Sequence, residues 1–456
     1  MKCFRRLLLL LISAALLLNV GGTFAETDGN AEPKHSHIGK LQALGLWASD
    51  VSADAVTRGD FARLMTAMLG MDELQIETVA DESRFSDLDK ENKAYAAVYF
   101  LSEKGVLSGD GDRFYPERPI TYDEAVKMLV CALGYETAAR ENGGYPAGYR
   151  ISARRFQLIR GSEHSGTAQL TAELCAEMIN DAMNAKLMEP SYGSEKAWSV
   201  KDTTVLQEYH KIGMVRGVLE ASGGSSLSAK DTYPDDILLI GDDKFQGDAK
   251  QFEKYVGYRM EAYYKLEDDK GERALIYMEP AAGANKIFEV SEEKILGCEN
   301  GCLLYEGEGG KTLRKQICSD KTRALFNGVY AEITDEDIKN ADRIIWIDNG
   351  TGNMPVVKID SFQVYVADSL DHTENILTVR FPKGEERTVE LGENNGEQTV
   401  ALTDHLGVPA DFYAVKKNSV LRVGKSKDGK KVSIILTGVQ KEGVLEDFNI
   451  DEKKLM

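Results

Sequence analysis

The N-terminal half of the chain repeats one pattern of apolar positions. After each of Thr57, Thr121 and Thr171, apolar residues recur every three or four positions, which places them on one stripe of an α-helix. The stripes comprise Phe61, Leu64, Met65, Met68 and Leu69; Ala125, Met128, Leu129, Ala132 and Leu133; and Cys175, Met178, Ile179, Ala182 and Met183. A shorter predicted helix with a turn precedes each stripe, at 41–46, 101–106 and 153–158. No such unit buries a core alone, so the pattern predicts helix–loop–helix units packed against one another, and we expect 37–188 to fold alone.

The pattern changes at Thr204, where short runs of β-forming residues separated by turns begin. The turns at 223–224, 348–350 and 428–429 favour antiparallel hairpins over β-α-β crossovers. The expected fold class is therefore multidomain, with an all-α N-terminal repeat domain followed by all-β barrel or sandwich modules. The predicted segments are 1–25 (signal peptide), 26–36 (flexible lead-in), 37–83, 84–137 and 138–188 (helical units), 189–203 (linker), and 204–350 and 351–456 (β-rich modules).

One short sequence recurs in the β-rich half. Gly-Val-Leu-Glu at 217–220 returns at 443–446, close to the last residue. Either the second copy closes an earlier sheet, or a further β-module follows it that this chain lacks.

The first residues have the three-part pattern of a secretion signal. Lys2, Arg5 and Arg6 precede an apolar run at 7–18, and small residues end at Ala25. The run is too short to cross a hydrocarbon core of about 30 Å comfortably. We therefore expect cleavage after Ala25, secretion, and no membrane insertion of the mature chain.

Charge and cysteine content narrow the classes of partner. The formal net charge of −19 argues against nucleic acid, whose phosphates need clustered cations, and requires that an anionic ligand meet a local cationic pocket. The sparse cysteines do not form the framework of a disulfide-rich domain. Cys298 and Cys302 flank a predicted hairpin turn, but a zinc site there lacks a second Cys/His pair. We expect no metal and no cofactor.

A set of motifs in the second helical unit resembles the S-layer homology domain. The motifs are Phe-Ser-Asp-Leu at 85–88, Ala-Tyr-Ala-Ala-Val at 94–98, Glu-Lys-Gly-Val-Leu-Ser-Gly at 103–109, Phe-Tyr-Pro at 114–116 and Pro-Ile-Thr at 119–121. The match to the family's motifs is strong over 84–135, good over 37–71 and weaker over 138–187. It implies a three-repeat helical assembly that binds a secondary cell-wall polysaccharide, often pyruvylated, within the peptidoglycan-associated glycan. The implied role is non-covalent attachment of an exported protein to a bacterial wall.

The family's signature, Thr-Arg-Ala-Glu, begins the second helix of each repeat. Thr caps the helix and Glu reaches back to form a capping box, while Arg stands at a helix N-terminus and can grip a carboxylate through two hydrogen bonds. The three copies here read Thr57-Arg58-Gly59-Asp60, Thr121-Tyr122-Asp123-Glu124 and Thr171-Ala172-Glu173-Leu174. Only the first copy keeps the Arg, and Lys93 stands where the family usually has Trp.

The candidate polymer-binding residues come from the first two copies. They are Arg58, Thr57, Asp60, Tyr122, Thr121 and Glu124. Helix capping alone accounts for all of them except Arg58 and Tyr122. Arg58 is either a ligand contact or a solvated surface residue, and Tyr122 either stacks on a sugar or packs between the helical units. Because the caps remain, we expect Arg58→Ala to leave folding nearly unaffected.

The sequence contains no complete match to a catalytic motif, so we expect no catalytic residues. Residues 309–312 end like a phosphate-binding loop, but Tyr305 stands where its first glycine belongs, and 348–353 lacks the ligands of a calcium loop. The leading hypothesis is a non-enzymatic surface protein of the S-layer type, with structural or adhesive β-modules. The alternatives are a wall-attached enzyme, catalytic in its β-half or in a missing C-terminal extension, and a carbohydrate-binding accessory protein without firm wall attachment.

Overall fold

The computed structural model divides the chain into two compact units. The helical unit comprises Lys34–Val215 and Glu261–Glu279, and the β unit contains Arg216–Met260 and Pro280–Met456. The structure describes residues 36–48, 50–51, 54–71, 83–191, 198–229, 233–266, 273–319, 322–352, 355–380, 387–392, 398–437, 448–449 and 454–455. The predicted signal peptide and the second Gly-Val-Leu-Glu sequence lie outside these residues. Among the described residues, no helix is long and apolar enough to cross a membrane.

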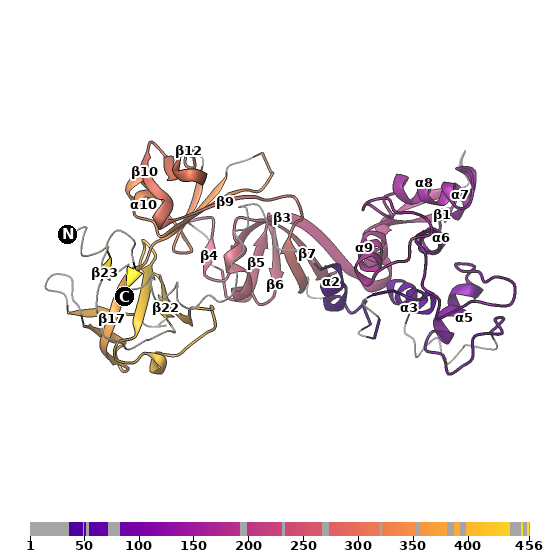
Figure 1. The fold of residues 1–456 in the computed structure, drawn as a ribbon, viewed down its shortest axis with the longest axis horizontal. Helices are drawn as coiled ribbons and strands as arrows, with labels where there is room; N and C mark the ends of the chain where they lie inside the picture. Colours follow the sequence, from indigo (N-terminus) through magenta and orange to yellow (C-terminus); the bar gives the residue numbers. More distant parts are fainter. Residues whose placement is uncertain are drawn as a thin grey trace. The chain divides into compact units, whose positions relative to one another are not determined.

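The helical unit consists mainly of short α-helices (Figure 1). These are α2 (His37–Ala43), α3 (Arg58–Met68), α5 (Tyr95–Glu103), α6 (Tyr122–Ala132), α7 (Glu136–Glu141), α8 (Ala147–Arg155) and α9 (Ala172–Met183). Two antiparallel strands, β1 (Lys186–Pro190) and β2 (Trp198–Thr204), overlap the segment predicted as a linker, and the π-helix η1 (Leu206–His210) follows them.

Threonine begins each of the three longer helices, α3, α6 and α9. Thr57 and Thr171 accept hydrogen bonds from the backbone amides of Asp60 (3.0 Å) and Leu174 (3.4 Å). Thr121 and Glu124 form a reciprocal capping box at the start of α6. Each cap satisfies a backbone donor that the first helical turn leaves unpaired, so helix starts inferred from the sequence coincide with those in the structure.

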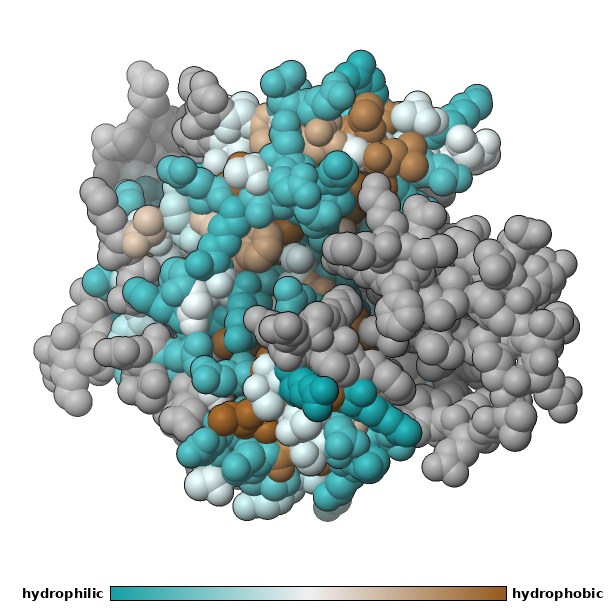
Figure 2. Space-filling model, turned by 90° about the vertical axis from the view of Figure 1, so that its left-hand side faces the viewer, coloured by the Kyte–Doolittle hydropathy of each residue, from teal (hydrophilic) through white to brown (hydrophobic). Residues whose placement is uncertain are grey.

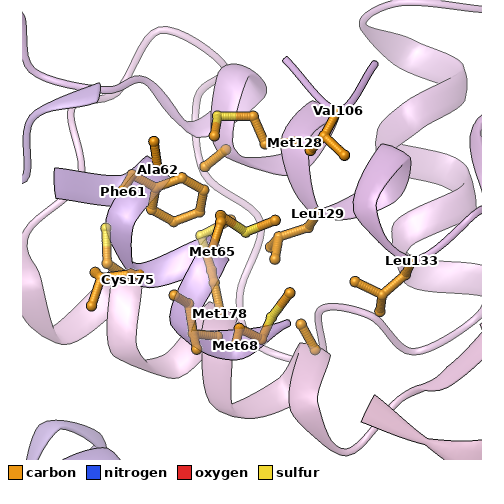
Figure 3. Close-up of a cluster of buried hydrophobic side chains, with 14 of the residues drawn as sticks. Phe61, Ala62, Met65, Met68, Val106, Met128, Leu129, Leu133, Cys175 and Met178 are labelled. Carbon is orange, nitrogen blue, oxygen red and sulfur yellow. The ribbon is translucent and has the colours of Figure 1, made fainter. Parts of the chain in front are cut away.

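The apolar stripes of α3, α6 and α9 meet in one core. Phe61, Met65, Leu129, Cys175 and Ile179 are each completely buried. Figure 3 shows side chains from the three helices directed toward one another. Each longer helix also packs against a shorter one that follows it in a cyclic order: α3 against α5, α6 against α8, and α9 against α2.

A closed ring of backbone hydrogen bonds joins the residues that precede the three caps. The amide of Val56 donates to the carbonyl of Leu170 (3.1 Å), that of Leu170 to Ile120 (3.2 Å), and that of Ile120 to Val56 (2.9 Å). All three side chains are fully buried. The ring holds the starts of α3, α6 and α9 close together at the centre of the helical unit.

The β-rich part of the chain forms open sheets, so the barrel alternative of the predicted fold class is wrong for the described residues. A strand order of β6-β5-β3-β7-β8, with β4 beside β3, makes the first sheet, and the division between the two units falls within β3, β7 and β8. Its strands are β3 (Ile212–Ser222), β4 (Ser225–Ser226), β5 (Ile237–Ile240), β6 (Asp243–Gln246), β7 (Arg259–Lys265) and β8 (Leu275–Pro280), with the 3-10 helix η2 (Lys250–Tyr255) between β6 and β7.

Three further sheets lie within the β unit. One has the order β14-β13-β16-β15-β9, a second β10-β11-β12, and a third β19-β18-β17-β21-β22-β20. Their strands are β9 (Lys286–Ser291), β10 (Ile295–Glu299), β11 (Cys302–Glu306), β12 (Thr312–Gln316), β13 (Arg323–Phe326), β14 (Val329–Tyr330), β15 (Arg343–Asp348), β16 (Val356–Asp360), β17 (Gln363–Asp371), β18 (Ile376–Val379), β19 (Thr388–Glu390), β20 (Thr399–Asp404), β21 (Val420–Lys425) and β22 (Lys431–Thr437). The shorter elements are η3 (Glu292–Lys294), η4 (Glu308–Gly310), α10 (Asp335–Lys339), η5 (Phe412–Ala414) and the pair β23 (Phe448–Asn449) and β24 (Lys454–Leu455).

Strand pairing in the β unit departs from the expected hairpins at two places. β13 pairs with β16 and β20 pairs with β22 in parallel. A parallel pair needs a crossover connection, and the intervening elements supply it in both cases. On the face shown in Figure 2, hydrophilic surface separates small hydrophobic patches, in keeping with the acidic composition.

Candidate functional site

A cavity of about 480 Å³ opens beside the start of α6 in the helical unit. Its lining combines cations, carboxylates and two tyrosines. The lining residues are Arg58, Val106, Leu107, Ser108, Gly109, Asp110, Tyr115, Arg118, Glu124, Lys127, Met128 and Tyr145. Two of the six predicted site residues, Arg58 and Glu124, are therefore brought together in one wall.

Arg58 is buried, with 7% of its surface exposed. Its Nε donates to the carbonyl of Phe114 (2.9 Å), and its Nη1 donates to Oε1 of Glu124 (2.7 Å). The guanidinium also lies over the Phe114 ring, 4.6 Å from its centroid. Burial lowers the pKa of Arg58 and the Glu124 carboxylate opposes that shift, so the side chain remains a cation. Arg58 thus joins the segment 84–137 to the segment 37–83, and it also lines the cavity.

Glu124 is the common acceptor of the site. Its Oε2 accepts from the amide and the hydroxyl of Thr121, both at 3.0 Å, while its Oε1 accepts from Arg58 and from Arg118. Burial alone would raise the pKa of Glu124, but the Thr121 amide and the two guanidinium groups hold it below its ordinary value. The carboxylate is therefore ionised and fully occupied, so it orients the cations around the cavity.

Asp87 positions the loop that forms the cavity's other side. Its two carboxylate oxygens accept from the amides of Phe114 and Tyr115, both at 2.8 Å. Tyr115 has a φ of 60°, a conformation that non-glycine residues rarely adopt, and these hydrogen bonds hold it there. The Phe-Ser-Asp-Leu motif at 85–88 therefore does not line the cavity itself, but it holds the loop that carries Tyr115 in place.

The more accessible functional groups of the cavity are ones that the sequence analysis missed. The side chain of Arg118 is 44% exposed, and Lys127 donates to the hydroxyl of Ser108 (3.0 Å). Tyr145 is 53% exposed, and the Lys127 ammonium lies 5.6 Å from its ring centroid. Arg118 stands three residues before the Thr121 cap and Lys127 stands on α6, so a search of the positions flanking the signature would have found them.

Thr57 and Asp60 form the start of α3 and do not line the cavity. The Thr57 hydroxyl donates to Oδ2 of Asp60 (2.9 Å), and Oδ1 of Asp60 lies 2.7 Å from the ammonium of Lys93. Lys93 occupies the position where the resembling family usually has Trp, and here it supplies a cation to Asp60. These two unusual residues compensate each other electrostatically.

The second and third copies of the signature are organised differently. Tyr122 is 2% exposed, is not part of the cavity lining, and lies 5.5 Å from the ring of His164. The neighbouring Asp123 accepts two hydrogen bonds from Arg150, at 2.6 and 2.7 Å. At the third copy, Ala172 is buried. Neither copy presents a side chain at the arginine position to solvent.

Metal-ligating groups are scattered among the described residues, and no three of them could hold a metal ion together. The cysteines at 131, 175, 298, 302 and 318 are free. Cys298 donates to Oδ1 of Asp335 (3.3 Å), and the same carboxylate accepts from the amides of Asn300 and Gly301 in the turn between β10 and β11. This cluster stabilises a turn.

Comparison with known proteins bears directly on the cavity. Residues 84–126 match the family profile of the S-layer homology domain, and they include most of the cavity lining. This segment is an S-layer homology domain.

Two curated proteins are similar to a larger part of the chain. One is the surface layer protein of Brevibacillus choshinensis, 28% identical over 224 residues, which cover 46% of this chain and 20% of that protein. The other is the middle cell wall protein of Brevibacillus brevis, 25% identical over 182 residues, covering 38% of this chain and 17% of that protein. The chain spans about a fifth of the length of these relatives. The S-layer homology domain and the relatives together support a secreted protein at the cell-wall surface.

Proposed function

We propose that the helical unit anchors this protein to the bacterial wall by binding an anionic secondary cell-wall polymer in the cavity beside α6. The observation that carries the proposal is the cluster of Arg58, Arg118 and Lys127 around one opening in a chain of net charge −19. A local excess of cations in an acidic protein attracts and holds an anionic ligand.

The cavity offers complementary groups for an acidic sugar, such as one bearing a pyruvyl ketal. Arg118 and Lys127 reach a carboxylate through charge-assisted hydrogen bonds, and Arg118 is free to turn from Glu124 because Arg58 still pairs with that carboxylate. Tyr115 and Tyr145 provide exposed ring faces for the apolar face of a sugar. Ser108 and Asp110 supply polar groups for hydroxyls.

The six residues singled out in the sequence then divide by role. Arg58 and Glu124 form the wall of the cavity and set the charge of its entrance. The helix starts are fixed by Thr57, Asp60 and Thr121. Tyr122 packs against His164 in the segment 138–188. We further propose that 37–83, 84–137 and 138–188 are three repeats of one anchoring domain. The ring of Val56, Ile120 and Leu170 and the cyclic packing of the helices support this division.

The β unit has a structural or adhesive role in this proposal and no enzymatic one. The relatives of the chain are named as surface layer and cell wall proteins, and the described side chains of the β unit form turns, sheet contacts and ion pairs rather than a nucleophile beside a base. A wall-glycan hydrolysis assay on the full chain tests this part. Turnover that a point substitution in the β unit abolishes would contradict it.

The anchoring role is tested by sedimentation of the full chain with purified wall sacculi of Brevibacillus choshinensis, before and after chemical removal of their secondary polymer. We expect binding only to the untreated sacculi. Arg118→Gln and Lys127→Gln should each weaken it about tenfold or more, since a charge-assisted hydrogen bond contributes about 1.5–3 kcal/mol. Lys104→Gln is the matched control, because this exposed cation lies in the same domain but outside the cavity lining. Equal binding to both kinds of sacculi would refute the proposal.

A further inference from the structure

Helix α8 presents a row of arginines to solvent on the side that continues from the cavity. Arg150 and Arg154 are four residues apart and share one face of the helix, while Arg155 lies about 100° further round. The opposite face, with Tyr149, Ser152 and Ala153, is buried. The helix therefore has an apolar inner side and a cationic outer side.

The outer arginines differ in how far other groups neutralise them. Arg150 is paired with Asp123 through two hydrogen bonds. Arg154 donates to the carbonyl of Gly161 (3.3 Å) and to the hydroxyl of Tyr122, and no carboxylate within the described residues forms an ion pair with it. The apolar side chain of Ile151, three residues before Arg154 on the same helix, is 51% exposed. A guanidinium without a carboxylate partner is available to an anionic ligand, and it stands out in a chain with 74 acidic and 55 basic residues.

The cavity and this face are continuous along the chain and in space. Tyr145, which lines the cavity, is followed directly by Pro146 and the first turn of α8. The ring of Tyr145 meets that of Tyr149 edge-on at 5.9 Å. Asp123, which holds Arg150, is adjacent in sequence to Glu124, which holds Arg58. Cations thus extend from the cavity past Tyr145 to Arg150 and Arg154.

We propose that α8 is a second contact surface for the same anionic wall polymer, which leaves the cavity past Tyr145 and runs along the face of Arg150 and Arg154. Arg154 holds an anionic group of the polymer beyond the sugar seated in the cavity. The identity of the polymer rests on the proposed function, but the second surface is a separate claim. It predicts that a long polymer binds more tightly than a fragment that fills the cavity alone.

The test compares two probes, the polymer released intact from Brevibacillus choshinensis sacculi and a disaccharide fragment of it, each titrated with the full chain. Arg154→Gln should weaken binding of the intact polymer about three- to fivefold and change disaccharide binding less than twofold, since an exposed ion pair contributes up to about fivefold in affinity. Arg154→Lys should restore most of the loss. Arg118→Gln should weaken both probes.

Arg155→Gln is the matched control, because it removes the same charge from the same helix on a different side. Thermal unfolding of each variant establishes that the helical unit is intact. Equal losses from Arg154→Gln and Arg155→Gln would overturn the proposed track in favour of diffuse attraction, as would equally tight binding of a single-stranded DNA oligonucleotide. An unchanged affinity of Arg154→Gln for the intact polymer would also overturn it while leaving the cavity function standing. Failure of the parent to bind either probe would overturn both.

Discussion

Arg58 Nη1 and Glu124 Oε1 lie 2.7 Å apart, although 66 positions separate the two residues in the sequence. Each stands in the first turn of its helix, Arg58 in α3 and Glu124 in α6. The side chain of Arg58 is 9% exposed and that of Glu124 is 22% exposed. One ion pair therefore joins α3 to α6 and forms part of the wall of the cavity.

The first prediction concerns the stability that this pair contributes. The structure revises the expectation that Arg58→Ala leaves folding unaffected, because the substitution strips a largely buried carboxylate of one cation and the Phe114 carbonyl of its donor. We expect the free energy of unfolding to fall by about 2–4 kcal/mol, somewhat less than for a fully buried pair because Arg118 remains. Urea unfolding measures it, and a double-mutant cycle with Glu124→Gln should give a coupling of about 1–2 kcal/mol. A loss below about 0.5 kcal/mol would show that the pair contributes little.

The second prediction is acid destabilisation through Glu124. Its pKa is lower in the folded protein than its ordinary value, since the hydrogen bonds from Thr121, Arg118 and Arg58 outweigh burial. The stabilisation that ionised Glu124 gives the folded protein is therefore fully present above the ordinary pKa range of a glutamate, about 4–5. It is lost as the pH falls through the lower pKa of the folded state. Unfolding followed from pH 6 to pH 3 should show a smaller loss of stability for Glu124→Gln than for the parent. Parallel curves for the two proteins would contradict this assignment.

The third prediction concerns the boundary of the helical unit. Lys40 in α2 is 5% exposed, and its ammonium lies 3.0 Å from Oε1 of Glu261 and 2.7 Å from Oε1 of Glu279. Burial alone would lower the pKa of Lys40, but Tyr263 and the two glutamates raise it. A fragment of 37–188 lacks both glutamates, so we now expect it to be less stable than a fragment of 34–279 by about 3–5 kcal/mol.

Chemical unfolding of the two fragments measures that difference. Lys40→Met should change the stability of the shorter fragment little, because the ammonium meets water once residues 261–279 are absent, and should destabilise the longer one, because it leaves two buried carboxylates without their cation. Equal stability of the two parent fragments would show that the segment from 261 to 279 is dispensable.

The fourth prediction is a lysine in the β unit that titrates near neutrality. Burial lowers the pKa of Lys358 to about 7, although Asp360 opposes the shift. Its ammonium donates to the carbonyl of Lys254 (2.8 Å) and lies 5.0 Å from the Tyr258 ring centroid. NMR titration of the side chain should give a midpoint near 7, whereas a midpoint near 10 would contradict the assignment.

The linkage of Lys358 to stability has a definite sign. Between a folded pKa of about 7 and the ordinary value of 10.5, the unfolded chain binds a proton that the folded protein does not. Stability attributable to this group therefore rises with pH across that interval, by at most about 1.4 kcal/mol per pH unit. Lys358→Met should remove this rise, with Lys244→Met, an exposed lysine of β6, as the control.

Local chemistry made much of the helical unit predictable from the sequence. The caps at Thr57, Thr121 and Thr171 depend on neighbours within three positions, and apolar residues at helical spacing must face a common core whatever surrounds them. The motifs at 85–121 likewise lie within the S-layer homology domain that the comparison finds at 84–126.

The form of the β-rich half was less predictable. Turn residues and alternating runs mark strands, but they do not state which strands pair. The parallel pairings of β13 with β16 and of β20 with β22, and the open order of the sheets, depend on contacts between distant segments. A closed barrel and an open sheet can therefore share one local pattern.

The sequence by itself determined the helix starts, the apolar stripes, the acidic charge and the presence of an S-layer homology domain, because each depends on residue type and near neighbours. Only the tertiary structure decided that Arg58 is enclosed by Phe114 and Glu124, while Arg118 and Lys127 remain accessible at the cavity. The reason is that exposure and ionic pairing are set by which distant segments fold against a side chain. A motif states which group is present, and the surrounding fold decides whether a ligand can reach it.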